Sequence, residues 1–347
     1  MNLFLLCFIG LQTLGSPGRA QEPAAAVPET PVAVLKREAL ALDPLVTSAL
    51  ARDFLKATER LPAAIPPRAV YRDEAAKTYK IETTDAPLAK DEKSKLTRID
   101  LDDSFYWTTR YGSPLAYTRP LDVLGRSGLE RASGLKILDF GYGTIGHLRL
   151  LASLGANVTG VDVDPLLHAV YSAPGDQGQI KNPQGRDGQL RLLIGRFPAD
   201  AATTTAVGGD YDLIISKNTL KNGYVHPERP VEKRRLLNLD VDDAAFVKTL
   251  YRALKPGGRV LIYNLSPAPS PPGQPYKNWA DGRCPFAKEV WEAAGFLVVA
   301  FDQDDSPAAR ALGHALGWDQ GSAPMDLKKD LFASYSLMRR REDTNSR

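Results

Sequence analysis

The chain has 347 residues, of which 43% are hydrophobic and 24% are charged, as in ordinary globular proteins. This length allows one large α/β domain with an extension, or two small domains. A formal net charge of +3 indicates no nucleic-acid partner, and the four scattered histidines predict no clustered metal site.

Residues 1–20 predict a signal peptide. Residues 3–14 are apolar, and the small residues Gly18 and Ala20 fit a peptidase site, whereas the run is too short to span a bilayer. We therefore expect an exported protein, periplasmic or secreted, with no membrane span in the mature chain. The alternative is an incidental apolar start or a misassigned start codon, which would leave the protein cytoplasmic. After cleavage only Cys284 remains, so no internal disulfide forms.

Residues 21–100 predict an N-terminal extension with one amphipathic helix. The helix is expected to begin at Asp43-Pro44, because an N-cap followed by proline is a common start signal. Its apolar face repeats every four residues in the order Val46, Leu50 and Phe54. Residues 62–98 are polar and interrupted by prolines, which favours an irregular arm wrapped around the core.

Residues 101–130 form an entry segment before the main domain. Phe105 to Tyr111 is the densest aromatic cluster of the chain, and a helix around Leu121 is expected to lead into the core.

Residues 136–165 predict a strand, a glycine turn, a helix and a second strand. The apolar run at 136–140 is typical of a buried parallel strand, and Gly141 and Gly143 follow it. The second strand ends on Asp162. The unit has the length of a right-handed crossover.

The chemistry of this unit indicates a nucleoside ligand. Turn glycines allow close approach of a ligand to the backbone, and an acid such as Asp162 at the end of the second strand can accept both ribose hydroxyls. Gly141, Gly143 and Gly146 also satisfy the dinucleotide pattern G-x-G-x-x-G, so the glycines alone do not indicate which cofactor binds. Asp139 favours a cofactor with a methionine moiety, because its carboxylate would repel a pyrophosphate and suits the ammonium of the methionine.

The sequence Asp139-Phe140-Gly141-Tyr142-Gly143 resembles the first motif of class I S-adenosylmethionine-dependent methyltransferases. Ile145 stands where that family commonly has a third glycine. The string L-K-P-G-G-R-V-L-I at 254–262 resembles the family's turn before its fifth strand. The resemblance covers about residues 131–340.

The resemblance implies further contacts with S-adenosylmethionine. It implies that the segment 101–130 folds over the cofactor as a lid, in which Trp107, Arg110 and Tyr111 either bind or pack on the core. After a third strand at 190–194, Arg196 stands where the family usually has an acid for the adenine amino group; Asp200 is a substitute, and Phe197 could pack on adenine. The expected cofactor residues are Asp139, Gly141, Gly143, Asp162, Val163, Arg196, Phe197, Ser216 and Tyr111.

The acceptor side is expected after the fourth strand, at residues 217–227. This segment lacks the Asn-Pro-Pro-Tyr of methyltransferases that act on amide or exocyclic amino groups. An imidazole is a suitable proton acceptor for an oxygen or nitrogen nucleophile, so His226 is the candidate base. Lys217, Lys221 and Tyr224 could orient an anionic substrate. The alternative is a solvated loop with incidental charges.

The remaining pattern completes the fold. A helix capped by Asp240 or Asp242 precedes a strand at 259–263, and a proline-rich loop at 266–285 follows. Further expected elements are helices at 286–294 and 307–316, and strands at 296–301 and 331–338.

We therefore predict an α/β fold, Rossmann-like, with seven strands, mostly parallel, an antiparallel last strand, and an N-terminal helical or irregular extension. The predicted divisions are 1–20, 21–100, 101–130 and 131–342. The predicted function is methyl transfer from S-adenosylmethionine to an oxygen or nitrogen acceptor. The alternative is an exported, non-catalytic protein that uses the same fold for binding or as a scaffold.

Overall fold

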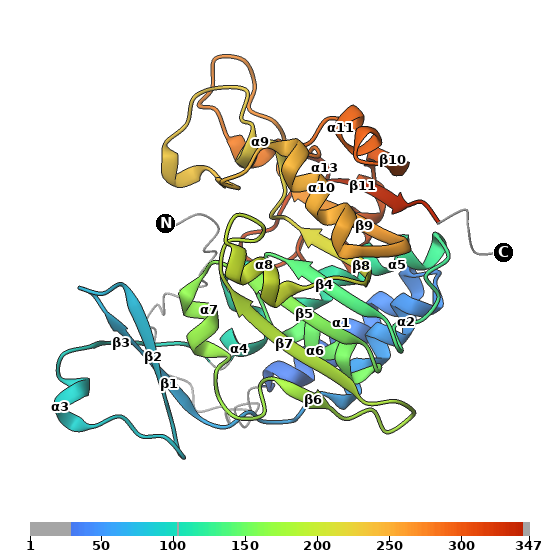
Figure 1. The fold of residues 1–347 in the computed structure, drawn as a ribbon. Helices are drawn as coiled ribbons and strands as arrows, with labels where there is room; N and C mark the ends of the chain where they lie inside the picture. Colours follow the sequence, from blue (N-terminus) through green and yellow to red (C-terminus); the bar gives the residue numbers. More distant parts are fainter. Residues whose placement is uncertain (1–28, 103, 343–347) are drawn as a thin grey trace, which may run out of the picture.

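The computed structural model describes residues 29–102 and 104–342 (Figure 1). The predicted signal peptide lies outside these residues. Within the described residues, no helix combines the length and apolar character needed to cross a membrane.

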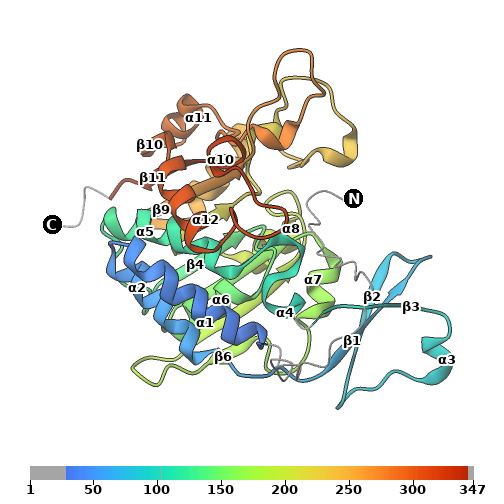
Figure 2. The same ribbon diagram turned by 180° about the vertical axis from the view of Figure 1, so that it is seen from behind.

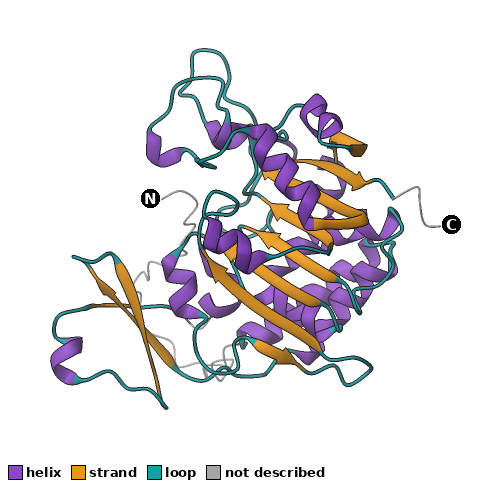
Figure 3. Cartoon of the chain, viewed as in Figure 1, coloured by secondary structure: helices purple, strands orange, loops and turns teal. Residues whose placement is uncertain are grey.

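A sheet forms the centre of the molecule (Figure 3). It has eight strands, in the order β10-β11-β9-β8-β4-β5-β7-β6. Parallel pairing joins β9, β8, β4, β5 and β7, whereas β11 is antiparallel to both of its neighbours. The α/β class and the antiparallel last strand are confirmed. The strands are β4 Lys136–Phe140, β5 Asn157–Asp162, β6 Gly178–Ile180, β7 Gly188–Ile194, β8 Tyr211–Lys217, β9 Leu254–Ser266, β10 Phe296–Asp304 and β11 Phe332–Arg340.

The prediction of seven strands missed β6. This short edge strand, in a segment where no strand was predicted, pairs antiparallel with β7. Its glycine- and proline-rich surroundings conceal it, because a three-residue strand is too short to show an alternating pattern.

The order of the strands creates a switch point between β4 and β8. From β4 the chain proceeds outward through β5 to β7, and then returns to β8 on the other side of β4. Ligands of open α/β sheets bind at such points, beyond the carboxyl ends of the strands.

Helices cover both faces of the sheet (Figures 1 and 2). Two apolar cores lie between these helices and the sheet. One face carries α1 Pro31–Leu42, α2 Ala49–Lys56, α5 Thr118–Arg126, α6 Gly146–Ser153, α7 Pro165–Val170 and α12 Ser306–Ala315. The other carries α8 Ala201–Val207, α10 Asp243–Ala253 and α11 Lys288–Ala293. The short helices are α3 Lys90–Lys93, α4 Phe105–Thr108, α9 Asn222–Val225 and α13 Leu327–Asp330.

The start of α10 shows how local sequence fixes these helices. Asp242 is the N-cap, and its Oδ1 accepts a hydrogen bond from the Ala245 N–H at 2.7 Å. Phe246 and Leu250, one turn apart, are both buried under the sheet.

Within the described residues, the extension contains α1, α2 and the short α3, where the sequence predicted one helix. The predicted start at Asp43-Pro44 is wrong, because that dipeptide forms a 3₁₀ turn between α1 and α2. Ser48 is the N-cap of α2. Asp122 of α5 accepts hydrogen bonds from the N–H groups of Thr47 and Ser48, at 2.9 and 2.8 Å, and so holds the chain extended before α2.

Residues 68–99 form a small antiparallel sheet instead of the expected irregular arm. The strands are β1 Arg68–Asp73, β2 Thr78–Thr83 and β3 Thr97–Ile99, in the order β2-β1-β3. This sheet projects from the body of the molecule beside α7 (Figures 1 and 2). The alternation of Tyr79 and Ile81 with polar residues is the local signal that predicts such a strand.

Candidate functional site

The glycine turn after β4 has the conformation that its sequence demands. Gly141 and Gly143 have φ angles of 75° and 59°, a region that side chains other than glycine rarely adopt. The Gly143 N–H donates to Asp162 Oδ2 at 3.2 Å, so the turn is tied to the end of β5. Gly146 serves packing, because a Cβ there would lie 2.8 Å from Pro114 of the entry segment.

Asp162 ends β5 and faces the carboxyl edge of the sheet. Its Oδ1 accepts the N–H groups of Val163 and Asp164 at 2.7 and 3.0 Å. Burial raises the pKa of Asp162 above its ordinary value, although these backbone bonds and that from Gly143 oppose the shift. Each carboxylate oxygen has two lone pairs, so the fixed side chain keeps accepting capacity for a ligand hydroxyl.

Exposed apolar side chains lie next to this carboxylate. Asp162 is in register with Ile194 at the end of β7, and Ile194 is 42% exposed. Val163 is 55% exposed and Tyr111, from the entry segment, is 47% exposed. We call Asp162, Val163, Ile194 and Tyr111 the edge cluster. Ile194 was not predicted; as the last residue of the third strand, it could have been found by its position.

The entry segment contacts this edge in part. The Tyr111 hydroxyl lies 3.1 Å from Asp164 Oδ2, and Arg110 forms an ion pair with the same carboxylate. Trp107 is 2% exposed and packs edge-to-face on Tyr106, so it belongs to the core.

Other predicted cofactor residues have structural partners. Arg196 pairs with Asp240, and Asp200 caps α8. The ring of Phe197 is 3% exposed and packs against Phe140, with 6.5 Å between centroids. The Ser216 hydroxyl donates to the Phe140 carbonyl at 3.2 Å and links β8 to β4.

Asp139 lies in a fully buried cluster that the sequence did not predict. Its Oδ2 is 2.5 Å from Nε2 of His147 on α6, and the His147 ring stacks on Tyr117 at 3.5 Å between centroids. Burial lowers the pKa of His147, although Asp139 opposes this, so the imidazole is neutral and donates its N–H to the carboxylate. Asp139 Oδ1 has no hydrogen-bond partner within the described part of the chain. Only the polar character of His147 within an apolar helix could have indicated this pairing.

The four acceptor-side candidates lie in two groups. The first contains Lys217, Lys221 and Tyr224, and its two lysines are 8% and 5% exposed. The Lys221 Nζ lies 5.4 Å from the ring centroid of Tyr224. His226 belongs to the second group, together with Asp243.

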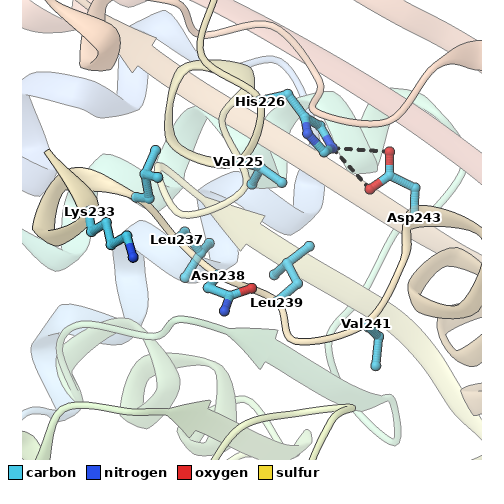
Figure 4. Close-up of a pocket in the computed structure, with 9 residues that line it drawn as sticks. Val225, His226, Lys233, Leu237, Asn238, Leu239, Val241 and Asp243 are labelled. Carbon is cyan, nitrogen blue, oxygen red and sulfur yellow. Dashed lines mark hydrogen bonds and ion pairs between the residues drawn. The ribbon is translucent and has the colours of Figure 1, made fainter. Parts of the chain in front are cut away.

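His226 lines a cavity of about 390 Å³ (Figure 4). Its Nε2 lies 2.9 and 3.0 Å from the two carboxylate oxygens of Asp243 at the start of α10. A carboxylate that orients an imidazole is the usual arrangement of a general base. The cavity is otherwise mostly apolar, lined by Val225, Leu236, Leu237, Leu239 and Val241, with Lys233 and Asn238.

The residues present fit the adenosine half of S-adenosylmethionine better than its methionine half. The edge cluster offers a ribose acceptor and an apolar surface for an adenine. At the glycine turn, however, side chains of this chain approach the backbone: a Cβ on Gly141 would lie 2.3 Å from the Thr219 hydroxyl, and one on Gly143 would lie 2.9 Å from Tyr111. The methionine half is therefore narrow, and Thr219 must turn away to open it.

No protein-family model and no curated protein matches the sequence. Among solved structures, the chain is similar to a phosphoethanolamine N-methyltransferase of Haemonchus contortus, at 14% identity and a TM-score of 0.40, over 84% of this chain and 74% of that chain. It is similar to an S-adenosylmethionine-dependent methyltransferase of Mesorhizobium loti, at 18% identity and a TM-score of 0.36, over 62% and 95%. It is also similar to magnesium protoporphyrin IX methyltransferase of Synechocystis, at 16% identity and a TM-score of 0.33, over 67% and 82%. Values this low assign no activity.

Proposed function

We propose that this protein is an S-adenosylmethionine-dependent methyltransferase that binds its cofactor beyond the carboxyl ends of β4, β5 and β7. The observation that carries the proposal is the edge cluster beside the glycine turn. Asp162 would accept the ribose hydroxyls, and Val163 and Ile194 would contact the adenine. The cofactor supplies a methyl group already activated by the sulfonium charge, so the chain has mainly to align the acceptor and exclude water.

The acceptor side of the proposal is the His226–Asp243 pair. His226 would accept a proton from an oxygen or nitrogen nucleophile that is bound in the adjacent cavity, and Asp243 would hold the imidazole in position. The apolar lining would take the body of the acceptor. Export through residues 1–20 stays part of this proposal.

One observation favours the second candidate, a non-catalytic protein that binds a nucleoside through the same edge. Thr219 and Tyr111 lie against the two turn glycines, and Asp139 is bonded to His147. A ligand without an amino-acid tail, such as 5′-methylthioadenosine, would avoid all three contacts.

Calorimetric titration of the full chain with S-adenosylmethionine and S-adenosylhomocysteine tests the proposal. We expect micromolar binding that is lost in Asp162→Ala and in Ile194→Glu. The second variant changes an exposed side chain and therefore leaves the fold intact, which circular dichroism would verify. Asp330→Ala, an exposed aspartate on α13, is the matched control and should bind normally.

Absence of binding to both compounds would refute the methyltransferase proposal. Binding of 5′-methylthioadenosine alone would favour the second candidate.

A further inference from the structure

Two lysines lie at the switch point between β4 and β8. Lys217 is the last residue of β8, and Lys221 is the N-cap residue of α9 four positions later. Both side chains are buried, with residue exposures of 8% and 5%. We call them the buried lysine pair.

Neither ammonium group has an ion-pair partner among the described residues. The Lys221 Nζ donates to the Leu265 carbonyl of β9. The Lys217 Nζ lies 5.5 Å from the ring centroid of Tyr117 and feels the charge of Asp139 without forming a salt bridge. Asp139 is itself bonded to His147, so it is only a partial counter-charge.

Buried lysines without an ion-pair partner are costly to fold. An uncompensated buried charge destabilises a protein by several kcal/mol, and an apolar residue of similar volume would remove that cost. Burial lowers the pKa of Lys217 to about 8 and that of Lys221 to about 7, and mutual repulsion adds to the second shift. The cost of burying Lys217 and Lys221 would be offset if both ammonium groups bind a ligand at this edge of the sheet.

The charges around the pair favour one kind of ligand. When both lysines are protonated, two positive charges face the single negative charge of Asp139, because burial keeps His147 neutral. Tyr117 and Tyr224, which also face the pair, remain neutral because burial raises the pKa of each hydroxyl. One monovalent anion would balance this set, whereas a phosphate dianion would exceed it.

We propose that Lys217 and Lys221 form a subsite for the carboxylate of a ligand bound at the switch point. This inference rests on the proposed function in one respect, namely that the carboxylate belongs to the cofactor's methionine moiety or to the methyl acceptor. Both sources present the same chemistry to the lysines. The acceptor source would restrict substrates to carboxylic acids.

The test uses the full chain and the variants Lys217→Met and Lys221→Met, which keep the side-chain volume and remove the charge. Lys328→Met, at an exposed position, is the matched control. The probes are S-adenosylhomocysteine, 5′-methylthioadenosine, which has the same nucleoside without the carboxylate, and sodium acetate with inorganic phosphate beside it. Calorimetry in two buffers of different ionisation enthalpy reports the protons taken up on binding.

If the cofactor supplies the carboxylate, S-adenosylhomocysteine binding takes up protons at pH 8 and weakens about tenfold or more in each lysine variant. Binding of 5′-methylthioadenosine is then unchanged. If the acceptor supplies it, both nucleosides bind all variants equally, and acetate binds the unmodified chain with proton uptake that the variants lose. Phosphate should bind more weakly than acetate.

Equal behaviour of the unmodified chain and both variants toward all four probes would overturn the inference. A folding defect is separable, because replacing an unpaired buried lysine by methionine should raise the unfolding temperature without ligand. Failure of the proposed function is distinguishable as well: acetate binding with proton uptake, in a chain that binds neither nucleoside, would leave the subsite standing alone.

Discussion

Replacing Asp176 should destabilise the protein and loosen the entry segment. Asp176 lies in the loop after α7, and its side chain is 4% exposed. Its Oδ2 accepts hydrogen bonds from Arg68 Nη1 of β1 at 2.6 Å and from the Ala173 N–H at 2.9 Å. Its Oδ1 accepts the Tyr106 hydroxyl of α4 at 2.9 Å. One carboxylate thus joins the small sheet, the entry segment and the main domain.

The size of the effect follows from what Asp176→Ala leaves behind. The Arg68 guanidinium, 7% exposed, would lose its counter-charge and keep hydrogen bonds to two backbone carbonyls, of Val170 at 2.7 Å and of Pro66 at 3.4 Å. Breaking a buried pair on one side costs about 3–5 kcal/mol, and the retained bonds place the expectation near the lower end. The Arg68→Met/Asp176→Ala double variant should lose less than the sum of its single variants, by about 1 kcal/mol or more.

Urea unfolding followed by circular dichroism measures these losses. The control is Glu59→Ala, which breaks the exposed ion pair with Lys36 and should cost about 1 kcal/mol or less. A loss for Asp176→Ala as small as that of the control, or additive single variants, would refute the reasoning.

Two further predictions concern stability. The pKa values of Lys217 and Lys221 in the folded chain, about 8 and 7, lie below the ordinary 10.5. Between each folded value and 10.5, the unfolded chain binds more protons than the folded chain. The free energy of unfolding should therefore rise with pH from about 7 toward 10.5. The rise, on the order of 1 kcal/mol per pH unit for each lysine, should shrink in Lys217→Met and Lys221→Met; an unchanged pH slope would contradict it. Gly188→Ala should lower the unfolding free energy by about 1–3 kcal/mol, since its Cβ would lie 2.1 Å from the Ala152 carbonyl oxygen, a backbone atom. Gly185→Ala, whose Cβ would meet nothing closer than 3.6 Å, is the control, and equal urea midpoints for the two would disprove the clash.

The local pattern predicted the core elements because each carries its own signal. A buried strand reads as an apolar run, a turn that requires positive φ needs glycine, and a helix repeats its apolar face. These signals located β4, the turn at Gly141 and Gly143, and the final antiparallel strand β11. They failed for β6, which is too short, and for the start of α2, where Asp122, 74 residues away from Ser48, fixes the chain.

The sequence by itself therefore determined the fold class and the position of the glycine turn and of Asp162, because these depend on neighbours along the chain. The tertiary structure alone decided which side chains share the site. Ile194 lies beside Asp162 through strand register, His147 bonds one oxygen of Asp139, and Lys217 and Lys221 lose most of their contact with water. Burial and the pairing of charges arise from segments far apart in sequence, and no local pattern encodes them.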